Sequence, residues 1–157
     1  MCVGFPGGKR VISSVHREGR QGGGTMSDPI VYIDRSDIRE GKLEEVRAGL
    51  VDLVDFVEAS EPLLISYGFY INDQGTGMTL VAIHPDSASL ELHMDVGGQI
   101  FRKFADLINL RTIEIYGRPS DKALEQLQQK AEFLGDNASV VVLEQHAGFI
   151  RLGSATT

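Results

Sequence analysis

The residue best suited to chemistry in this sequence is His93. It lies between Leu90 and Met94, so a helix through this stretch places the imidazole on the same inward face as two apolar side chains. An imidazole titrates near neutral pH and can take a proton from an acidic substrate, which makes His93 our candidate catalytic base. The alternative is a structural histidine, hydrogen-bonded to a backbone carbonyl at a helix end.

A second histidine, His84, ends an expected strand directly before Pro85. It can face a ligand, lie on the surface, or join His93 and the more distant His146 in a metal site. The spacing does not require a metal, because His84 and His93 fall on different elements and no carboxylate is fixed near them. We therefore expect no metal and no cofactor, and we retain His84 as a substrate-binding candidate.

Polar side chains on the expected strands can bind a substrate. Tyr67 and Tyr116 can orient an oxygenated aromatic ring by hydrogen bonding, and Arg111 can stabilise a developing oxyanion. Asp34 and Arg35 are similar candidates, but side chains alternate along a strand, so the register leaves open which of them faces inwards. Tyrosines in such positions are more often core or dimer-interface residues than substrate-binding ones.

Apolar side chains are available to line a pocket around these groups. Phe101 is the one we assign to substrate binding, and Met78, Met94 and Phe104 are its possible neighbours. Ordinary core packing explains each of them when it is taken alone.

Eight expected elements position these residues. Strands are predicted at 30–38, 63–71, 76–83, 110–116 and 138–144. Helices are predicted at 42–58, from residue 87 onwards, and at 120–134, with Ser87 and Ser120 as N-caps. Gly97 and Gly98 are expected to interrupt the second helix, and turn residues at 72–75 join two strands in a hairpin.

The order of these elements is β-α-β-β-α-β followed by α-β. The first six form a ferredoxin-like split βαβ unit, an α+β fold with one antiparallel sheet and its helices on one face. The last two form an extra C-terminal helix and strand. Because both faces of the strands are apolar, at positions such as Phe69, Leu80 and Val140, we expect a second copy packed sheet to sheet. The predicted assembly is a homodimer, a dimeric α+β barrel.

Charge and glycine are unevenly distributed along the 157 residues. The net charge is −7, but residues 1–25 carry +3 and seven of the 18 glycines, which leaves −10 for the remainder. We expect residues 1–25 to be a disordered leader or an upstream extension, with Met26 as the natural start. The domain is then 26–150, followed by a frayed tail at 151–157.

Composition also excludes several classes of function. The acidic domain argues against nucleic acid or an anionic membrane as partner, and the apolar runs are far shorter than the ~20 residues of a membrane span. A single cysteine, Cys2, excludes a disulfide framework, so we expect a cytoplasmic protein. The sequence has no glycine-rich phosphate loop and no Cys–His nucleophile pair.

Three phrases resemble the antibiotic biosynthesis monooxygenase-like family of dimeric α+β barrels, over roughly residues 30–116. Residues 39–45, Arg-Glu-Gly-Lys-Leu-Glu-Glu, resemble the family's start of its first helix, and residues 61–67, Glu-Pro-Leu-Leu-Ile-Ser-Tyr, resemble the phrase before its second strand. Residues 84–93 match a phrase that ends in histidine, and an aromatic residue follows at Phe101. The family's tryptophan is replaced by His84, and its usual acidic residue by Ala82.

The resemblance implies a site in the cleft between helices and sheet, with His93 at its mouth. In some relatives a polar residue at the end of the first strand faces the substrate, as Asp34 or Arg35 would here. The first hypothesis is a cofactor-independent monooxygenase acting on a phenolic or quinol-like compound. The alternative is a non-catalytic barrel that binds a small ligand or serves as an interaction module, since the fold hosts both.

Overall fold

The chain forms five strands and three α-helices within residues 28–153, which are the residues that this computed structural model describes. The strands are β1 (Ile30–Ile38), β2 (Ser66–Ile71), β3 (Gly77–His84), β4 (Ile108–Tyr116) and β5 (Ser139–Leu143). The helices are α1 (Leu43–Ser60), α2 (Ser87–Phe101) and α3 (Asp121–Leu134), and a short 3-10 helix covers Arg102–Phe104. The predicted leader at 1–25 and the last residues of the predicted tail lie outside this range.

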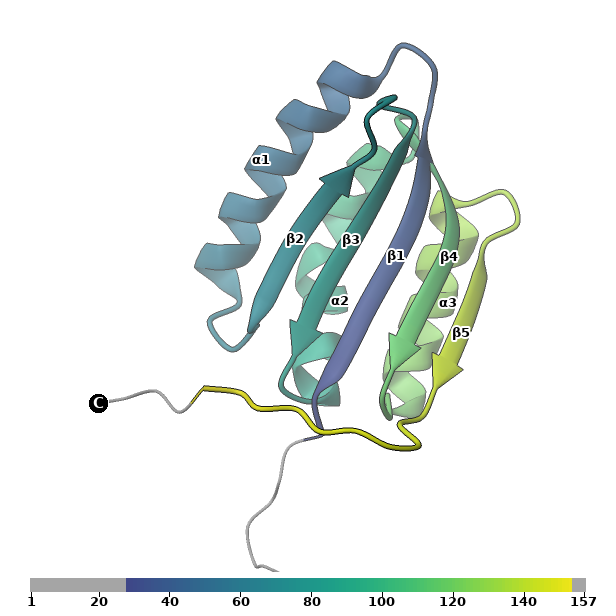
Figure 1. Ribbon diagram of the computed structural model, residues 1–157. Helices are drawn as coiled ribbons and strands as arrows, with labels where there is room; N and C mark the ends of the chain where they lie inside the picture. The colour runs from purple at the N-terminus through teal and green to yellow at the C-terminus, as the bar shows by residue number, and fades with distance from the viewer. Residues whose placement is uncertain (1–27, 154–157) are drawn as a thin grey trace, which may run out of the picture.

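The strands form one sheet in the order β2-β3-β1-β4-β5 (Figure 1). The first four pair antiparallel, as the ferredoxin-like prediction requires, and β5 adds to the edge parallel to β4. Helix α3 makes the crossover between β4 and β5. The α+β fold class is therefore confirmed, including the extra C-terminal helix and strand.

The helices cover one face of the sheet, and the core lies between them. The apolar spacing in α1 buries Val46, Leu50, Leu53 and Val57 against it. Along β1 every second side chain points to the helices, so Asp34 is buried and Arg35 lies on the opposite face. This answers the question of register that the sequence left open.

Helix α2 runs unbroken through Gly97 and Gly98, so the predicted interruption is wrong. Gly97 has a different role, because a Cβ atom there would lie 2.4 Å from Cζ of Phe101. Glycine at position 97 thus leaves room for the Phe101 ring and does not end the helix. A glycine inside a helix lowers stability by about 1 kcal/mol relative to alanine. The ring of Phe101 lies directly over the helix at this point.

Several element ends also differ from the prediction by a few residues, and two of them have a local cause. The N-cap of α2 is Asp86, one residue before the predicted Ser87, because the Asp86 side chain accepts a hydrogen bond from the Ser89 amide at 2.8 Å. Strand β2 begins at Ser66, three residues after the predicted start, because Leu64 donates to the Glu61 carbonyl in the turn after α1.

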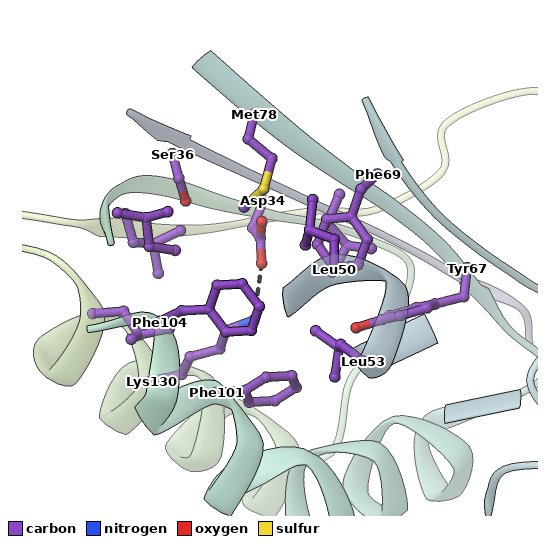
Figure 2. A pocket seen from close by; sticks show the side chains of 14 residues that line it. Asp34, Ser36, Leu50, Leu53, Tyr67, Phe69, Met78, Phe101, Phe104 and Lys130 are labelled. Atoms are coloured by element: carbon purple, nitrogen blue, oxygen red, sulfur yellow. Dashed lines mark hydrogen bonds and ion pairs between the residues drawn. The ribbon is translucent and has the colours of Figure 1, made fainter. Parts of the chain in front are cut away.

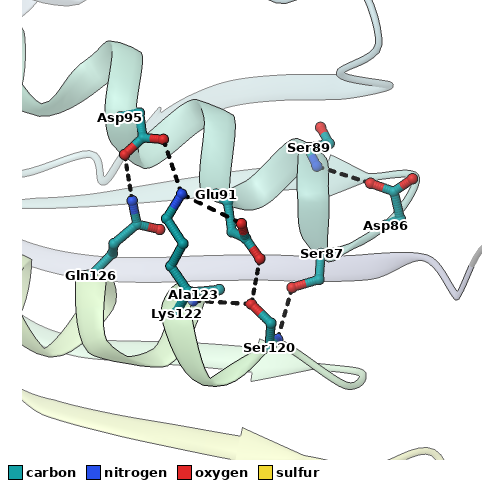
Figure 3. Close-up of polar contacts among 9 residues, drawn as sticks. All are labelled: Asp86, Ser87, Ser89, Glu91, Asp95, Ser120, Lys122, Ala123 and Gln126. Carbon is teal, nitrogen blue, oxygen red and sulfur yellow. Dashed lines mark hydrogen bonds and ion pairs between the residues drawn. The ribbon is translucent and has the colours of Figure 1, made fainter.

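A polar network fixes α2 against the start of α3 (Figure 3). Ser120 caps α3 as predicted, accepting from the Ala123 amide, and its hydroxyl donates to Glu91 at 2.5 Å. Further along, Lys122 and Gln126 of α3 both bind Asp95 of α2. These contacts hold the two helices side by side, with a groove between them.

Among the helices of residues 28–153, none has the length and apolar content that a membrane crossing needs.

Candidate active site

His93 is fully buried and paired with a carboxylate. Helix α2 directs its ring inwards, and Glu61, at the C-terminal end of α1, meets Nδ1 through both oxygens at 2.8 and 2.9 Å. A carboxylate in this position accepts the Nδ1 hydrogen and orients the ring, which leaves Nε2 as the atom available for proton transfer. The expectation that no carboxylate is fixed near the histidines is therefore wrong.

His84 is also fully buried, so the surface placement is wrong as well. Its Nδ1 lies 3.0 Å from the Ser89 hydroxyl, and its ring centroid lies 5.4 Å from that of His93. Burial, with a smaller contribution from the charge of His93, lowers the pKa of His84 to about 3. His84 is thus a neutral neighbour of the Glu61–His93 pair.

Tyr67 and Phe101 cover the His93 ring. Their ring centroids lie 5.2 and 5.4 Å from it, Tyr67 in an edge-on arrangement. Burial, with smaller contributions from the charges of Asp34 and Glu61, raises the pKa of Tyr67 well above its ordinary value, so its hydroxyl stays protonated. That hydroxyl can donate a hydrogen bond to an oxygen in the cavity beyond it.

Three buried polar atoms in this cluster have no hydrogen-bond partner: Nε2 of His84, Nε2 of His93 and the hydroxyl of Tyr67. Leaving such groups unpaired in a protein interior costs about 1–3 kcal/mol each. Unpaired groups gathered at one place are typical of a site that completes its hydrogen bonds with a ligand or water.

A second polar cluster lies on the other side of Phe101. Lys130 of α3 donates to Asp34 at 2.8 Å and to the Tyr32 hydroxyl at 2.7 Å, and Tyr32 donates to Asp34 at 2.8 Å. Lys130 also lies over the Phe101 ring, with Nζ 4.3 Å from the centroid. Asp34 was expected to bind substrate, whereas Lys130 was missed.

Both clusters border one cavity between the helices and the sheet (Figure 2). Its polar lining consists of Asp34, Ser36, Tyr67 and Lys130, and the remainder is apolar, including Phe101 and Phe104. The cavity leaves about 20 Å³ for the centre of a water-sized molecule, which is enough for about one water. His93 lies behind Tyr67 and Phe101 and does not itself line this space.

Arg111 and Tyr116 lie on the far face of the sheet. A bulge in β4 opposite Arg35 and Ser36 turns Arg111 outwards, where it binds Asp37. Tyr116 donates to Glu114 on that same face. The structure therefore does not bring these two candidates together with His93 within one chain.

Two residues missed in the sequence, Glu61 and Lys130, complete the site. Lys130 left a signal, because it stands on the apolar stripe of α3 between Leu127 and Leu134. The sequence signal for Glu61 is weaker, since it is only the residue before a proline at a helix end. Within residues 28–153, His, Cys, Asp and Glu side chains form no group of three or more that could hold a metal ion.

Comparison with family models gives no match to this sequence, and comparison with curated proteins gives none either. Solved structures do match. MupZ from Pseudomonas fluorescens aligns with a TM-score of 0.59 and 20% identity, over 80% of this chain and 98% of that one. A conserved protein from Methanosarcina mazei aligns at 0.51 and 22%, over 59% and 93% of the two chains.

SnoaB, a cofactor-independent oxygenase from Streptomyces nogalater, aligns with a TM-score of 0.51 and 11% identity in a mutant form. That match covers 60% of this chain and 96% of SnoaB. Identities this low show a common fold. The predicted resemblance to antibiotic biosynthesis monooxygenase-like proteins is thereby confirmed for the fold.

Proposed function

We propose that this protein is a cofactor-independent oxygenase acting on a small phenolic or quinol-like compound, with His93 as its catalytic base. The observation that carries the proposal is the buried Glu61–His93 pair, whose Nε2 is free and whose ring contacts two side chains of the cavity. The likeness in fold to SnoaB supports the same general chemistry.

The residues divide the work as follows. Glu61 holds the Nδ1 hydrogen, so Nε2 of His93 takes the proton of the phenol. The resulting phenolate is electron-rich, and a ring carbon bearing hydrogen binds dioxygen to form a peroxide, which takes the proton back from Nε2. Loss of water from the peroxide leaves a quinone, so one oxygen atom enters the product and the other enters water.

Tyr67, Phe101, Asp34 and His84 are the substrate-binding residues of this proposal. The protonated Tyr67 hydroxyl donates to the substrate oxygen, and Phe101 packs against the ring. Because Phe101 and Tyr67 stand between His93 and the cavity, the substrate reaches Nε2 only when the Phe101 side chain turns aside. The proposal therefore includes this movement.

Oxygen uptake tests the proposal. With 1-naphthol as substrate and no added cofactor, His93→Ala should lower turnover by about 100-fold or more. Glu61→Gln should lower it less and shift its pH profile, since the amide keeps the hydrogen bond but not the charge. His146→Ala is the matched control, because His146 is exposed. Unchanged turnover in His93→Ala with the fold intact would remove His93 as the base.

A second candidate is a barrel that binds a small ligand without catalysis. The position of His93 favours it, since the histidine lies behind Tyr67 and Phe101 and does not line the cavity that a ligand would enter. Binding of 1-naphthol with no oxygen uptake above the His93→Ala background would select this function over the first.

We also propose a homodimer, in the cytoplasm, built on the outer sheet face. On that face Val31, Ile33, Val81 and Ile83 form an apolar patch that no helix of residues 28–153 covers (Figure 1). A second copy packed there would remove it from water. Sedimentation should give twice the chain mass of 17.1 kDa, and Val81→Glu should reduce it to 17.1 kDa. A wild-type monomer would overturn this assembly.

A further inference from the structure

Lys130 has an environment that fold stability does not explain. Its side chain is only 7% exposed, and its ammonium group pairs with the equally buried Asp34. Lysine is rarely buried, and replacing a buried ion pair by apolar side chains of similar volume is often neutral or stabilising. A buried pair that borders a cavity is thus better explained by what the cavity binds.

The polar atoms around the cavity are mostly donors. The ammonium group has three hydrogens, of which Tyr32 and Asp34 accept two. The hydroxyls of Ser36 and Tyr67 face the same space and have no partner. The donor groups around the cavity, from Lys130, Ser36 and Tyr67, therefore outnumber its single carboxylate, Asp34, and a ligand oxygen can accept hydrogen bonds from them.

The charge of the pair limits what this oxygen can be. Asp34 already neutralises Lys130, so a second anion beside the ammonium would be repelled by the Asp34 carboxylate at nearly the same distance. A carbonyl oxygen accepts hydrogen bonds without adding a charge. The electrostatics therefore favour a ketone or quinone oxygen over a carboxylate.

The body of such a ligand has a place on the other side of Phe101. The groove between α2 and α3 has a volume of about 420 Å³, and Phe101, Lys130 and Leu134 line both the groove and the inner cavity. Phe133 and the exposed Arg102, which stack on each other at 5.6 Å, form its outer rim. An aromatic ring in this groove lies one side chain away from the ammonium.

We propose that the groove between α2 and α3 and the inner cavity form one binding site for planar aromatic carbonyl compounds. The ring system occupies the groove, the Phe101 side chain turns aside, and Lys130 donates to the carbonyl oxygen together with Ser36 or Tyr67. This rests on the proposed function, whose quinone product carries such an oxygen, and names the group that the site recognises.

The first test compares three probes with one ring system by calorimetry, in the absence of turnover. 2-Acetonaphthone should bind about tenfold or more tightly than 2-ethylnaphthalene, which lacks the oxygen, because a hydrogen bond to a charged donor contributes about 1.5–3 kcal/mol. 2-Naphthoate should bind more weakly than 2-acetonaphthone. Equal binding of the first two, or tightest binding of 2-naphthoate, overturns the proposal.

Substitutions of the charged residues test where the ketone oxygen binds. The double variant Asp34→Asn/Lys130→Met removes both charges without leaving one unpaired, and should abolish the preference for the ketone while still binding 2-ethylnaphthalene. Lys122→Met, the same substitution on an exposed part of α3, should keep the preference. A preference that survives in the double variant excludes Lys130 as the donor.

Gly98→Leu tests the groove itself. Gly98 lines the groove, and a Cβ atom there meets nothing within 4 Å, so leucine fits the helix and fills the groove. Binding of 2-acetonaphthone should fall at least tenfold, and unchanged binding overturns the assignment of the groove. Because the readout is binding, a wild-type protein that takes up oxygen with 1-naphthol but does not prefer the ketone would overturn this inference alone. A wild-type protein that prefers the ketone but takes up no oxygen would overturn the proposed function alone.

Discussion

Two polar clusters are buried beneath the same helices, and they satisfy their hydrogen bonds in different ways. In the cluster of Tyr32, Asp34 and Lys130, each polar group of the side chains has a partner within 2.8 Å. In the cluster of Glu61, His84 and His93, the two Nε2 atoms are left unpaired. The first cluster pairs its charges within the protein, and the second leaves two nitrogen atoms available to a ligand or a proton.

The difference separates binding from proton transfer. The Lys130 ammonium group is held by Asp34 and Tyr32 and has one further hydrogen to donate without rearranging. A histidine with a free nitrogen can change its protonation state during a reaction, and its carboxylate partner fixes the ring while it does so. We therefore assign recognition to the cluster around Lys130 and reaction to the cluster around His93.

The largest expected effect comes from breaking the saturated cluster. Lys130→Met should lower the free energy of unfolding by about 3–5 kcal/mol, because it leaves the Asp34 carboxylate buried and unpaired. Adding Asp34→Asn should restore most of this loss. Urea unfolding at neutral pH measures both variants. A double variant as unstable as Lys130→Met would mean that packing, rather than charge, dominates this cluster.

A smaller effect is expected at the histidine cluster, in the pH dependence of the unfolding free energy. The pKa of His84 is about 3 in the folded protein and 6.5 ordinarily. Between these values the unfolded chain binds a proton that the folded chain does not, so stability decreases as the pH falls, by about 1.4 kcal/mol per pH unit. Going from pH 6.5 to 4.5, wild type should lose roughly 2 kcal/mol more than His84→Gln.

Urea titrations of both proteins across this range give the comparison directly. The other titrating groups are common to the two proteins, so only the difference between the curves reports His84. Parallel curves would show that water or a local opening solvates the ring, and that His84 is not held neutral by burial.

Periodicity was enough to predict the elements of this fold, and tertiary contacts decided where several of them end. The apolar spacing of α1 and the alternation of β1 and β3 follow from local geometry, so their identity was readable from the sequence. The need for glycine at position 97 depends on the Phe101 ring that packs against it, which helical periodicity does not contain. The bulge that turns Arg111 outwards is equally a product of pairing between strands.

The site was predicted in part for the same reason. The inward position of His93 follows from helical spacing, and so was found. Its partner Glu61 stands 32 positions away in the sequence, and Lys130 stands 96 positions from Asp34. Such pairs depend on how helices rotate against the sheet, which the sequence of one chain does not specify.

The Phe101 side chain lies between the two clusters and packs on Gly97. Substitution of Gly97 is expected to give the smallest change in unfolding free energy, and Gly98 offers a matched control. Its ring centroid lies 5.4 Å from that of His93 and 4.3 Å from Nζ of Lys130. Gly97→Ala adds a Cβ atom 2.4 Å from the far end of that ring, so the ring must move or the helix must shift. We expect a loss of about 1 kcal/mol in unfolding free energy, at the lower end of overpacking because a side chain can yield.

Gly98→Ala makes the same substitution one residue later, where a Cβ atom meets nothing within 4 Å. It should stabilise the protein by about 0.5–1 kcal/mol, since alanine is the better helix former. Urea unfolding of the pair gives effects of opposite sign if Gly97 serves the Phe101 ring. If both variants are stabilised, the Phe101 ring moves without a loss in unfolding free energy. Its side chain could then turn aside and connect the Lys130 and His93 clusters.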